Sequence, residues 1–127
     1  AVLPQDSIVF QQLADYDIVV AGIFPFAESW LPQALNQLQK INPDTKVILV
    51  YLGNPELIPA DENFAAVLAT YEASEAMQEI AAEQIFGALP LVGRLPISTR
   101  FYKSGSSITT KALGRLGYAN PQTVGVD

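Results

Sequence analysis

Two short, continuous apolar runs constrain the fold of this 127-residue chain more than any other feature. Residues 17–22 (Asp-Ile-Val-Val-Ala-Gly) and 46–52 (Lys-Val-Ile-Leu-Val-Tyr-Leu) are rich in β-branched side chains. Runs of this kind are typical of strands that are buried on both faces of a parallel sheet. Between them, apolar residues recur at intervals of three and four, as on one face of an amphipathic helix. These residues are Leu31, Ala34, Leu35, Leu38 and Ile41.

The rest of the first hundred residues continues this alternation. A short helix is predicted from Ile8 to about Asp15, with Asp6 or Ser7 as its cap. After a loop that has room for one helical turn, residues 64–70 are interpreted as a third strand. Residues 74–86 are predicted to form a strong helix that Ser74 caps. Gly87 fits the left-handed position that commonly ends a helix.

This order of elements predicts an α/β fold. We expect a three-layer α/β/α sandwich with a small, mainly parallel sheet of flavodoxin or Rossmann type, with right-handed crossovers. Three or four strands are few for such a sheet, which indicates a truncated or partner-supported domain. The α/β domain is placed at residues 1–103. Residues 104–127 are interpreted as an irregular tail or linker with few backbone hydrogen bonds and ready access for proteases.

The composition excludes several function classes. The net charge is −6 and the seven basic residues are scattered, which argues against nucleic acid as a partner. The chain has no cysteine and no histidine, so thiolate nucleophiles and Cys/His zinc sites are excluded, and neither a metal nor a cofactor is expected. No apolar run reaches about 18 residues, so no transmembrane segment is predicted. Any catalysis would use carboxylates, hydroxyls, lysine or tyrosine.

The loop after the first strand carries the candidate binding residues. Ligands of open α/β sheets bind beyond the carboxyl ends of the strands. Phe24, Phe26 and Trp30 are candidates for stacking on a sugar ring, and Glu28 is a weak candidate for an acid or base. The structural alternative is that the aromatic rings pack against a neighbouring domain and that Glu28 favours a helix N-terminus. Asn54, after the second strand, is either a ligand contact or a turn residue.

Residues 85–98 (Ile-Phe-Gly-Ala-Leu-Pro-Leu-Val-Gly-Arg-Leu-Pro-Ile-Ser) carry a family resemblance. In family 3 glycoside hydrolases, a helix ends in Leu-Phe-Gly, and Gly-Arg/Lys-Leu-Pro-Val-Ser/Thr follows after a few residues. The two upstream apolar runs resemble the two preceding strands of that family in type and order. Residues 113–127 are similar to a linker that, in some members, leads into a serine-hydrolase domain of β-lactamase type. The resemblance covers nearly the whole chain.

The resemblance implies the C-terminal α/β sandwich of a β-N-acetylhexosaminidase-like member of this family. The parent enzyme would then carry an N-terminal barrel, act on a carbohydrate and be exported to the periplasm or the cell surface. This domain would be non-catalytic and would support or partly line the active site of a β-N-acetylhexosaminidase or β-glucosidase barrel. The alternative function is a stand-alone module that binds carbohydrate or another partner.

The resemblance also bears on individual residues. In the β-glucosidase subgroup this domain supplies an acid/base Glu from a pattern close to Gly-Glu-x-Pro-Tyr-x-Glu. Residues 22–28 read Gly-Ile-Phe-Pro-Phe-Ala-Glu, so the first Glu is absent and no catalytic residue is expected in this chain.

The motif around Gly93 is interpreted as a latch. Gly87 and Gly93 are expected in turns that only glycine tolerates, Arg94 reaches a carboxylate or carbonyl, and Pro96 keeps its segment out of a central strand.

Overall fold

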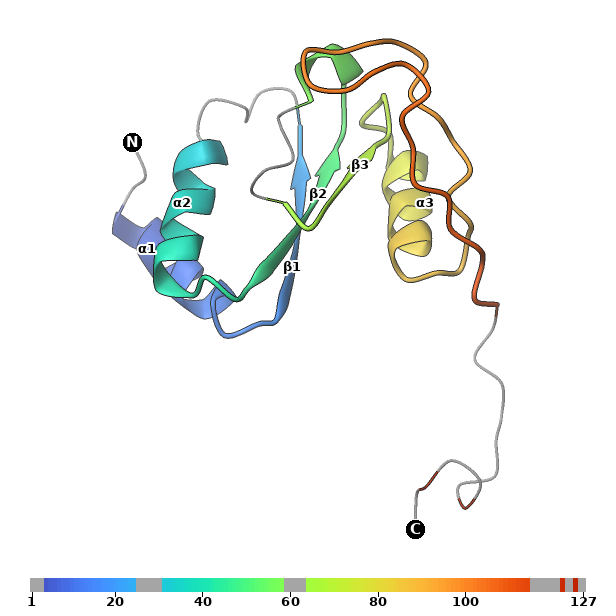
Figure 1. The fold of residues 1–127 in the computed structure, drawn as a ribbon. Coiled ribbons are helices and arrows are strands. Elements are labelled where there is room, and N and C mark those ends of the chain that lie inside the picture. Colours follow the sequence, from blue (N-terminus) through green and yellow to red (C-terminus); the bar gives the residue numbers. More distant parts are fainter. Residues whose placement is uncertain (1–3, 25–30, 59–63, 115–121, 123–124, 126–127) are drawn as a thin grey trace.

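A computed structural model describes residues 4–24, 31–58, 64–114, 122 and 125. Its centre is a three-stranded parallel sheet in the order β1-β2-β3 (Figure 1). The strands are β1 (Ile18–Ile23), β2 (Lys46–Tyr51) and β3 (Ala66–Ala69). The helices are α1 (Pro4–Leu13), α2 (Leu31–Ile41), α3 (Glu75–Ile85) and the 3-10 turn η1 (Pro55–Leu57). The prediction of a small α/β domain with a parallel sheet is confirmed.

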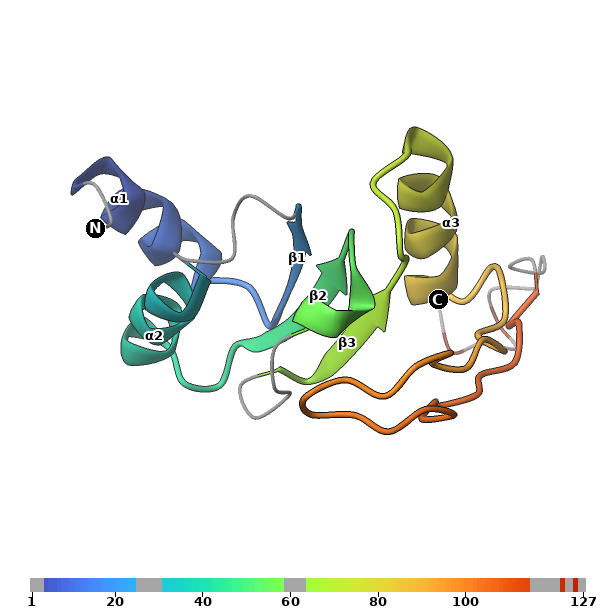
Figure 2. The same ribbon diagram turned by 90° about the horizontal axis from the view of Figure 1, so that it is seen from above.

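The helices lie on the two opposite faces of the sheet. Figure 2 shows α1 and α2 on one side of the strands and α3 on the other. Leu38 of α2 and Ile58, just after η1, pack on one face, whereas Ala81 of α3 packs on the other. The connections from β1 to β2 and from β2 to β3 therefore use the same face. Right-handed crossovers that move in one direction across a sheet have this property. The chain changes face only after β3, where α3 begins.

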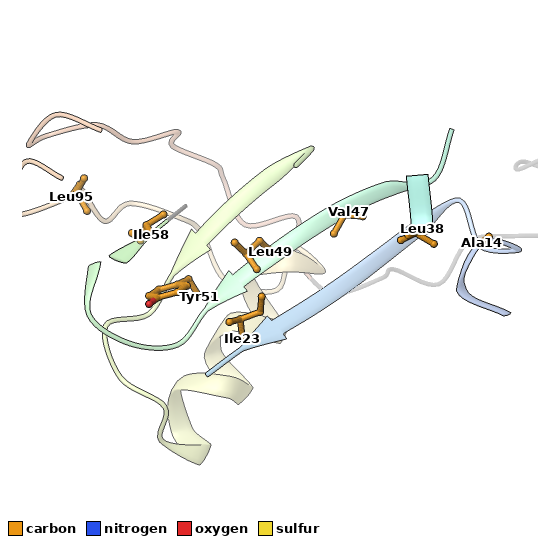
Figure 3. Close-up of a cluster of buried hydrophobic side chains, with 8 residues drawn as sticks. All are labelled: Ala14, Ile23, Leu38, Val47, Leu49, Tyr51, Ile58 and Leu95. Carbon is orange, nitrogen blue, oxygen red and sulfur yellow. The ribbon is translucent and has the colours of Figure 1, made fainter. Parts of the chain in front are cut away.

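The central strand β2 supplies side chains to both faces. Successive residues of a strand point to opposite sides. Val47, Leu49 and Tyr51 lie in the larger buried cluster, which extends along β2 from Ala14 and Leu38 to Ile58 and Leu95 (Figure 3). On the other side, a smaller cluster joins Val50, Leu52 and Ala81. The expected burial of this strand on both faces is confirmed.

The same expectation is wrong for β1. Ile18 is 56% exposed and Val20 is 46% exposed, although both are β-branched strand residues. Their neighbours Val19, Ala21 and Ile23 pack against the larger cluster. The physical reason is the position of α3, which packs on β2 and β3 through Ala81 and Ile85 and leaves the same face of β1 uncovered.

Polar contacts tie the end of α1 to the start of β2. The Thr45 hydroxyl is buried and donates a hydrogen bond to the Tyr16 carbonyl at 3.0 Å. The Asn42 side-chain amide donates to the Ala14 carbonyl at 2.8 Å.

Helix α1 begins at Pro4, earlier than expected, so that Asp6 and Ser7 lie within it. Proline is well suited to a first turn, because its missing N–H has no partner there.

Helix α3 has the expected ends. The Ser74 hydroxyl accepts a hydrogen bond from the Met77 N–H at 3.3 Å, which satisfies one free donor of the first turn. Gly87 has a φ of 79°, the left-handed conformation predicted for it. From this glycine the chain enters a long excursion, residues 87–113, which we call the strap.

The strap is bonded to itself across its two arms. The Leu113 N–H donates to the Gly87 carbonyl at 2.8 Å, and the Thr110 N–H donates to the Leu91 carbonyl at 2.9 Å. Nearer the tip, the Gly105 N–H donates to the Leu95 carbonyl at 2.7 Å. Within the described residues, backbone pairing between the two arms therefore extends to Leu113. The hydrogen bonds between the two arms are irregularly spaced, and some of them involve the hydroxyl groups of Ser107 and Thr110. Such an arrangement produces no periodic pattern in the sequence.

The latch interpretation holds for part of the strap. Leu95 is buried in the larger cluster, and half-buried Tyr102 packs beside it, so the strap is anchored to the sheet. Arg94 and Pro96 are exposed. The expectation for Gly93 is wrong, because its φ lies outside the left-handed region and an added Cβ would meet nothing within 4 Å. A backbone outside that region, with open space around it, accepts other residues, so glycine is not required there.

The two glycines are expected to differ in their tolerance of a side chain. Gly87→Ala should lower the free energy of unfolding by about 1 kcal/mol, because L-residues are disfavoured at a φ of 79°. The new Cβ would also lie 2.7 Å from Cδ1 of Leu113, which would have to rotate away. Gly93→Ala is the matched control and should leave stability unchanged. Urea unfolding of the two variants measures the difference, and equal loss in both would contradict the assignment.

Candidate functional site

The carboxyl ends of the three strands meet at one edge of the sheet. The Leu52 N–H donates to the Ile23 carbonyl at 2.9 Å, and the Thr70 N–H donates to the Tyr51 carbonyl at 3.0 Å. These bonds hold the starts of the three following loops side by side. The edge is where ligands of open α/β sheets bind, and the sequence-based candidates were chosen for that reason.

Phe24 is the only one of the four candidates in the first loop that lies within the described residues. Phe26, Glu28 and Trp30 fall outside them. Ile23 points into the larger cluster, and strand alternation turns Phe24 toward the α3 side, where it is 42% exposed. The ring therefore lines the groove between β1 and α3.

This groove is open and has a volume of about 310 Å³. Val20, Gly22 and Leu52 lie on its sheet side, and Ile85 and Phe86 lie on its helix side. Its lining contains no ionisable residue. A surface of this composition can bind apolar groups by removing them from water, but it has no group for acid–base chemistry.

Asn54 has the structural role that the sequence left open as an alternative. Its side-chain oxygen accepts a hydrogen bond from the Glu56 N–H at 3.0 Å and so caps η1. Pro55 follows as the first residue of that turn. The dipeptide Asn-Pro thus starts a helical turn at the end of β2, and the carboxamide oxygen is used for this purpose.

The turn after β3 contains a feature that sequence reasoning missed. Tyr71 has a φ of 65°, the only positive φ of a non-glycine residue among the described residues. The buried Thr70 hydroxyl lies 2.7 Å from the Glu72 carbonyl and 3.3 Å from the Tyr51 carbonyl, so hydrogen bonds connect the two sides of the turn. No glycine or asparagine marks the position, and the sequence therefore gave no signal for a left-handed residue.

The acidic residues near this edge are exposed. The Ser74 hydroxyl donates to Oε1 of Glu72 at 2.6 Å, which joins that carboxylate to the cap of α3. Glu56, Glu75 and Glu79 are exposed. No group of three or more acidic, histidine or cysteine residues that could hold a metal ion occurs in the described part of the chain. Among the described residues, the edge brings together two half-exposed aromatic rings (Phe24 and Tyr71), an apolar groove and two hydrogen-bonded turns.

Comparison with known protein families, with curated proteins and with solved structures gives no match. No helix in the described segments is both long enough and apolar enough to cross a membrane.

The turn at Tyr71 is expected to depend on the Thr70 hydroxyl. Thr70→Val keeps the shape of the side chain but removes the hydroxyl. The carbonyl groups of Tyr51 and Glu72 then lose their hydrogen bonds to this buried side chain. The free energy of unfolding should fall by about 1–2 kcal/mol. Thr70→Ser keeps the hydroxyl and should retain most of the stability. Thermal unfolding of both variants is the measurement. A valine variant as stable as the native chain would show that the hydroxyl does not hold the turn.

Proposed function

We propose that this chain is an accessory domain of a family 3 glycoside hydrolase, of the β-N-acetylhexosaminidase-like kind. In this role it supports a catalytic barrel and lines one side of its active site, while the barrel supplies the reacting carboxylates. The observation that carries the proposal is the segment Gly93–Ser98, whose sequence resembles the motif of that family.

The structural setting of this segment supports the proposal. Leu95, at the centre of the motif, is anchored in the main core beside Ile58 and Tyr51 (Figure 3). The strap then extends beside η1 near the carboxyl end of the sheet, as Figures 1 and 2 show. A loop that is fixed to the core at this end of an α/β sheet is well placed to meet a neighbouring domain at a ligand site.

The chemistry of the described edge favours an accessory role over a catalytic one. Hydrolysis of a glycoside by a retaining mechanism uses two carboxyl groups about 5–5.5 Å apart, one as acid and one as nucleophile. Glu56 and Glu72 follow different strands, both are exposed, and Glu72 is hydrogen-bonded to Ser74. The groove between β1 and α3 has no ionisable residue in its lining.

The isolated chain is therefore expected to hydrolyse no glycoside. A fluorogenic N-acetylglucosaminide and a fluorogenic glucoside should both react at the rate of buffer alone. A Glu28→Gln variant, tested beside the native chain, should give the same background rate. Turnover by the native chain that is lost in the variant would make Glu28 catalytic in its own right and would refute the accessory role.

The alternative from another class is a stand-alone sugar-binding module. The half-exposed ring of Phe24 at the carboxyl edge favours it, with Phe26 and Trp30 as further stacking residues. The accessory role predicts no saturable change in Trp30 fluorescence when N-acetylglucosamine is added, because half of the ligand site belongs to another domain. A saturable change at a Kd of about 1 mM or tighter that Phe24→Ala abolishes would favour the binding module instead. Tyr16→Ala, at an exposed aromatic residue outside this site, is the control.

A further inference from the structure

Tyr71 stands at a position where tyrosine is a costly choice. Its φ of 65° lies in the left-handed region, which glycine and asparagine adopt readily and other residues avoid. A residue of another kind stays in this region only when the surrounding structure holds it there, and the strain lowers the stability of the fold. Glycine or asparagine would form the same turn with less strain. The backbone of the turn therefore gives no reason for the tyrosine.

The hydrogen bonds of this turn do not use the tyrosine side chain. The buried Thr70 hydroxyl lies 2.7 Å from the Glu72 carbonyl and 3.3 Å from the Tyr51 carbonyl. On the following side, the Ser74 hydroxyl donates to the Glu72 carboxylate at 2.6 Å. These contacts hold the backbone on both sides of Tyr71. They would hold it equally well for another residue at that position, so the ring is not needed to form the turn.

Packing does not explain the tyrosine either. The side chain of Tyr71 is 45% exposed and belongs to neither of the two buried clusters. It forms no hydrogen bond, ring contact or cation–π contact with any other described residue. Strained residues cluster at active sites and ligand contacts, where the strain is tolerated because the side chain is needed. Tyr71 combines such strain with a side chain that the core does not use.

Tyr71 also lies at the edge where the ligand site is proposed. Ile23, Tyr51 and Ala69 are aligned across the three strands. Phe24 is the next residue after the first of these, and Tyr71 is the second residue after the last. Neighbouring strands lie about 4.8 Å apart, so the backbone positions of Phe24 and Tyr71 are about 10 Å apart along the edge. A ligand that lies across the carboxyl ends of the strands would reach both of them.

Tyrosine offers what the residues preferred by the backbone lack. Its ring presents a large, rigid apolar surface, and its phenol group both donates and accepts hydrogen bonds. A sugar ring is complementary to such a side chain, because its C–H groups form apolar faces and its hydroxyl groups lie around the rim. Glycine has no side chain, and asparagine has no comparable apolar surface. The presence of tyrosine thus points to a ligand of this mixed character.

We propose that Tyr71 is a ligand-contacting residue of the site at the carboxyl edge of the sheet, and that its ring packs on a sugar bound there. The tyrosine is retained for this contact although it destabilises the turn. The identity of the ligand as a sugar rests on the proposed function. The cost in stability does not, because it can be measured on the chain without any ligand.

The first part of the test measures the cost of the tyrosine. Tyr71→Gly should raise the Tm by about 2–5 °C, because glycine adopts the left-handed conformation without strain. Tyr71→Phe keeps both the strain and the ring and should leave the Tm unchanged. Tyr16→Gly is the matched control, at a tyrosine that is also exposed but has no positive φ. It should lower the Tm, because there glycine only increases the freedom of the unfolded chain.

The second part measures contact with a sugar in the native chain and the same three variants. In saturation-transfer NMR, the aromatic protons of the protein are irradiated and the signals of N-acetylglucosamine, added in excess, are observed. The method detects brief contacts, so it does not need the part of the site that another domain contributes. Tyr71→Gly should reduce the transfer about fivefold, the effect of losing one aromatic contact. Tyr71→Phe and Tyr16→Gly should retain it.

The proposal requires a higher Tm and a weaker transfer in the same variant, Tyr71→Gly. A Tm lowered as far as in Tyr16→Gly would overturn it, because the tyrosine would then carry no strain. Unchanged transfer in Tyr71→Gly, together with loss of transfer in Phe24→Ala, would also overturn it, and the sugar site would remain without Tyr71. No transfer in any of these proteins, the native chain included, would overturn the contact and the proposed lining of a sugar site together.

Discussion

The burial of β2 on both faces is the constraint on which the other elements depend. Leu49 is completely inaccessible to solvent and Tyr51 nearly so, while Val50 and Leu52 are buried on the opposite side. On one face of the sheet, α2, the segment after η1 and the strap pack against β2. On the other face, α3 packs against it. Burial of a large apolar side chain contributes about 1.5–3 kcal/mol, so this one strand supplies a large share of the stability. The layers are arranged around it.

Much of the fold was predictable because the signals are local and periodic. The β-branched runs, the helical spacing in α2, the Ser74 cap and the left-handed Gly87 each follow from chemistry within a few residues. The misses have a different origin. Exposure of Ile18 and Val20 depends on where α3 lies, and the freedom of Gly93 depends on the absence of any neighbour within 4 Å. Both are tertiary facts that a sequence pattern does not contain.

The candidate site divides in the same way. That loops at the carboxyl ends of the strands would meet was predictable from a parallel sheet, and so was the turn at Asn54. The left-handed conformation of Tyr71 was not predictable, because tyrosine has no intrinsic preference for it. Hydrogen bonds from the Thr70 hydroxyl to two carbonyl groups stabilise the turn. The groove was missed for a further reason. It is formed by residues of β1, β2 and α3 that each look like ordinary core positions in the sequence.

The parallel order of the sheet also has a kinetic consequence. Ile18 pairs with Lys46, and Ile48 pairs with Ala66. The three described strands therefore form no hairpin, in which a short turn would bring neighbouring strands together. Each pairing requires the closure of a long loop before its contacts are gained, and folding that depends on such contacts is slow. During that interval the apolar runs of β1 and β2 are accessible to other chains. The same runs that define the sheet therefore make newly synthesised chains prone to association before α2 has brought the strands together.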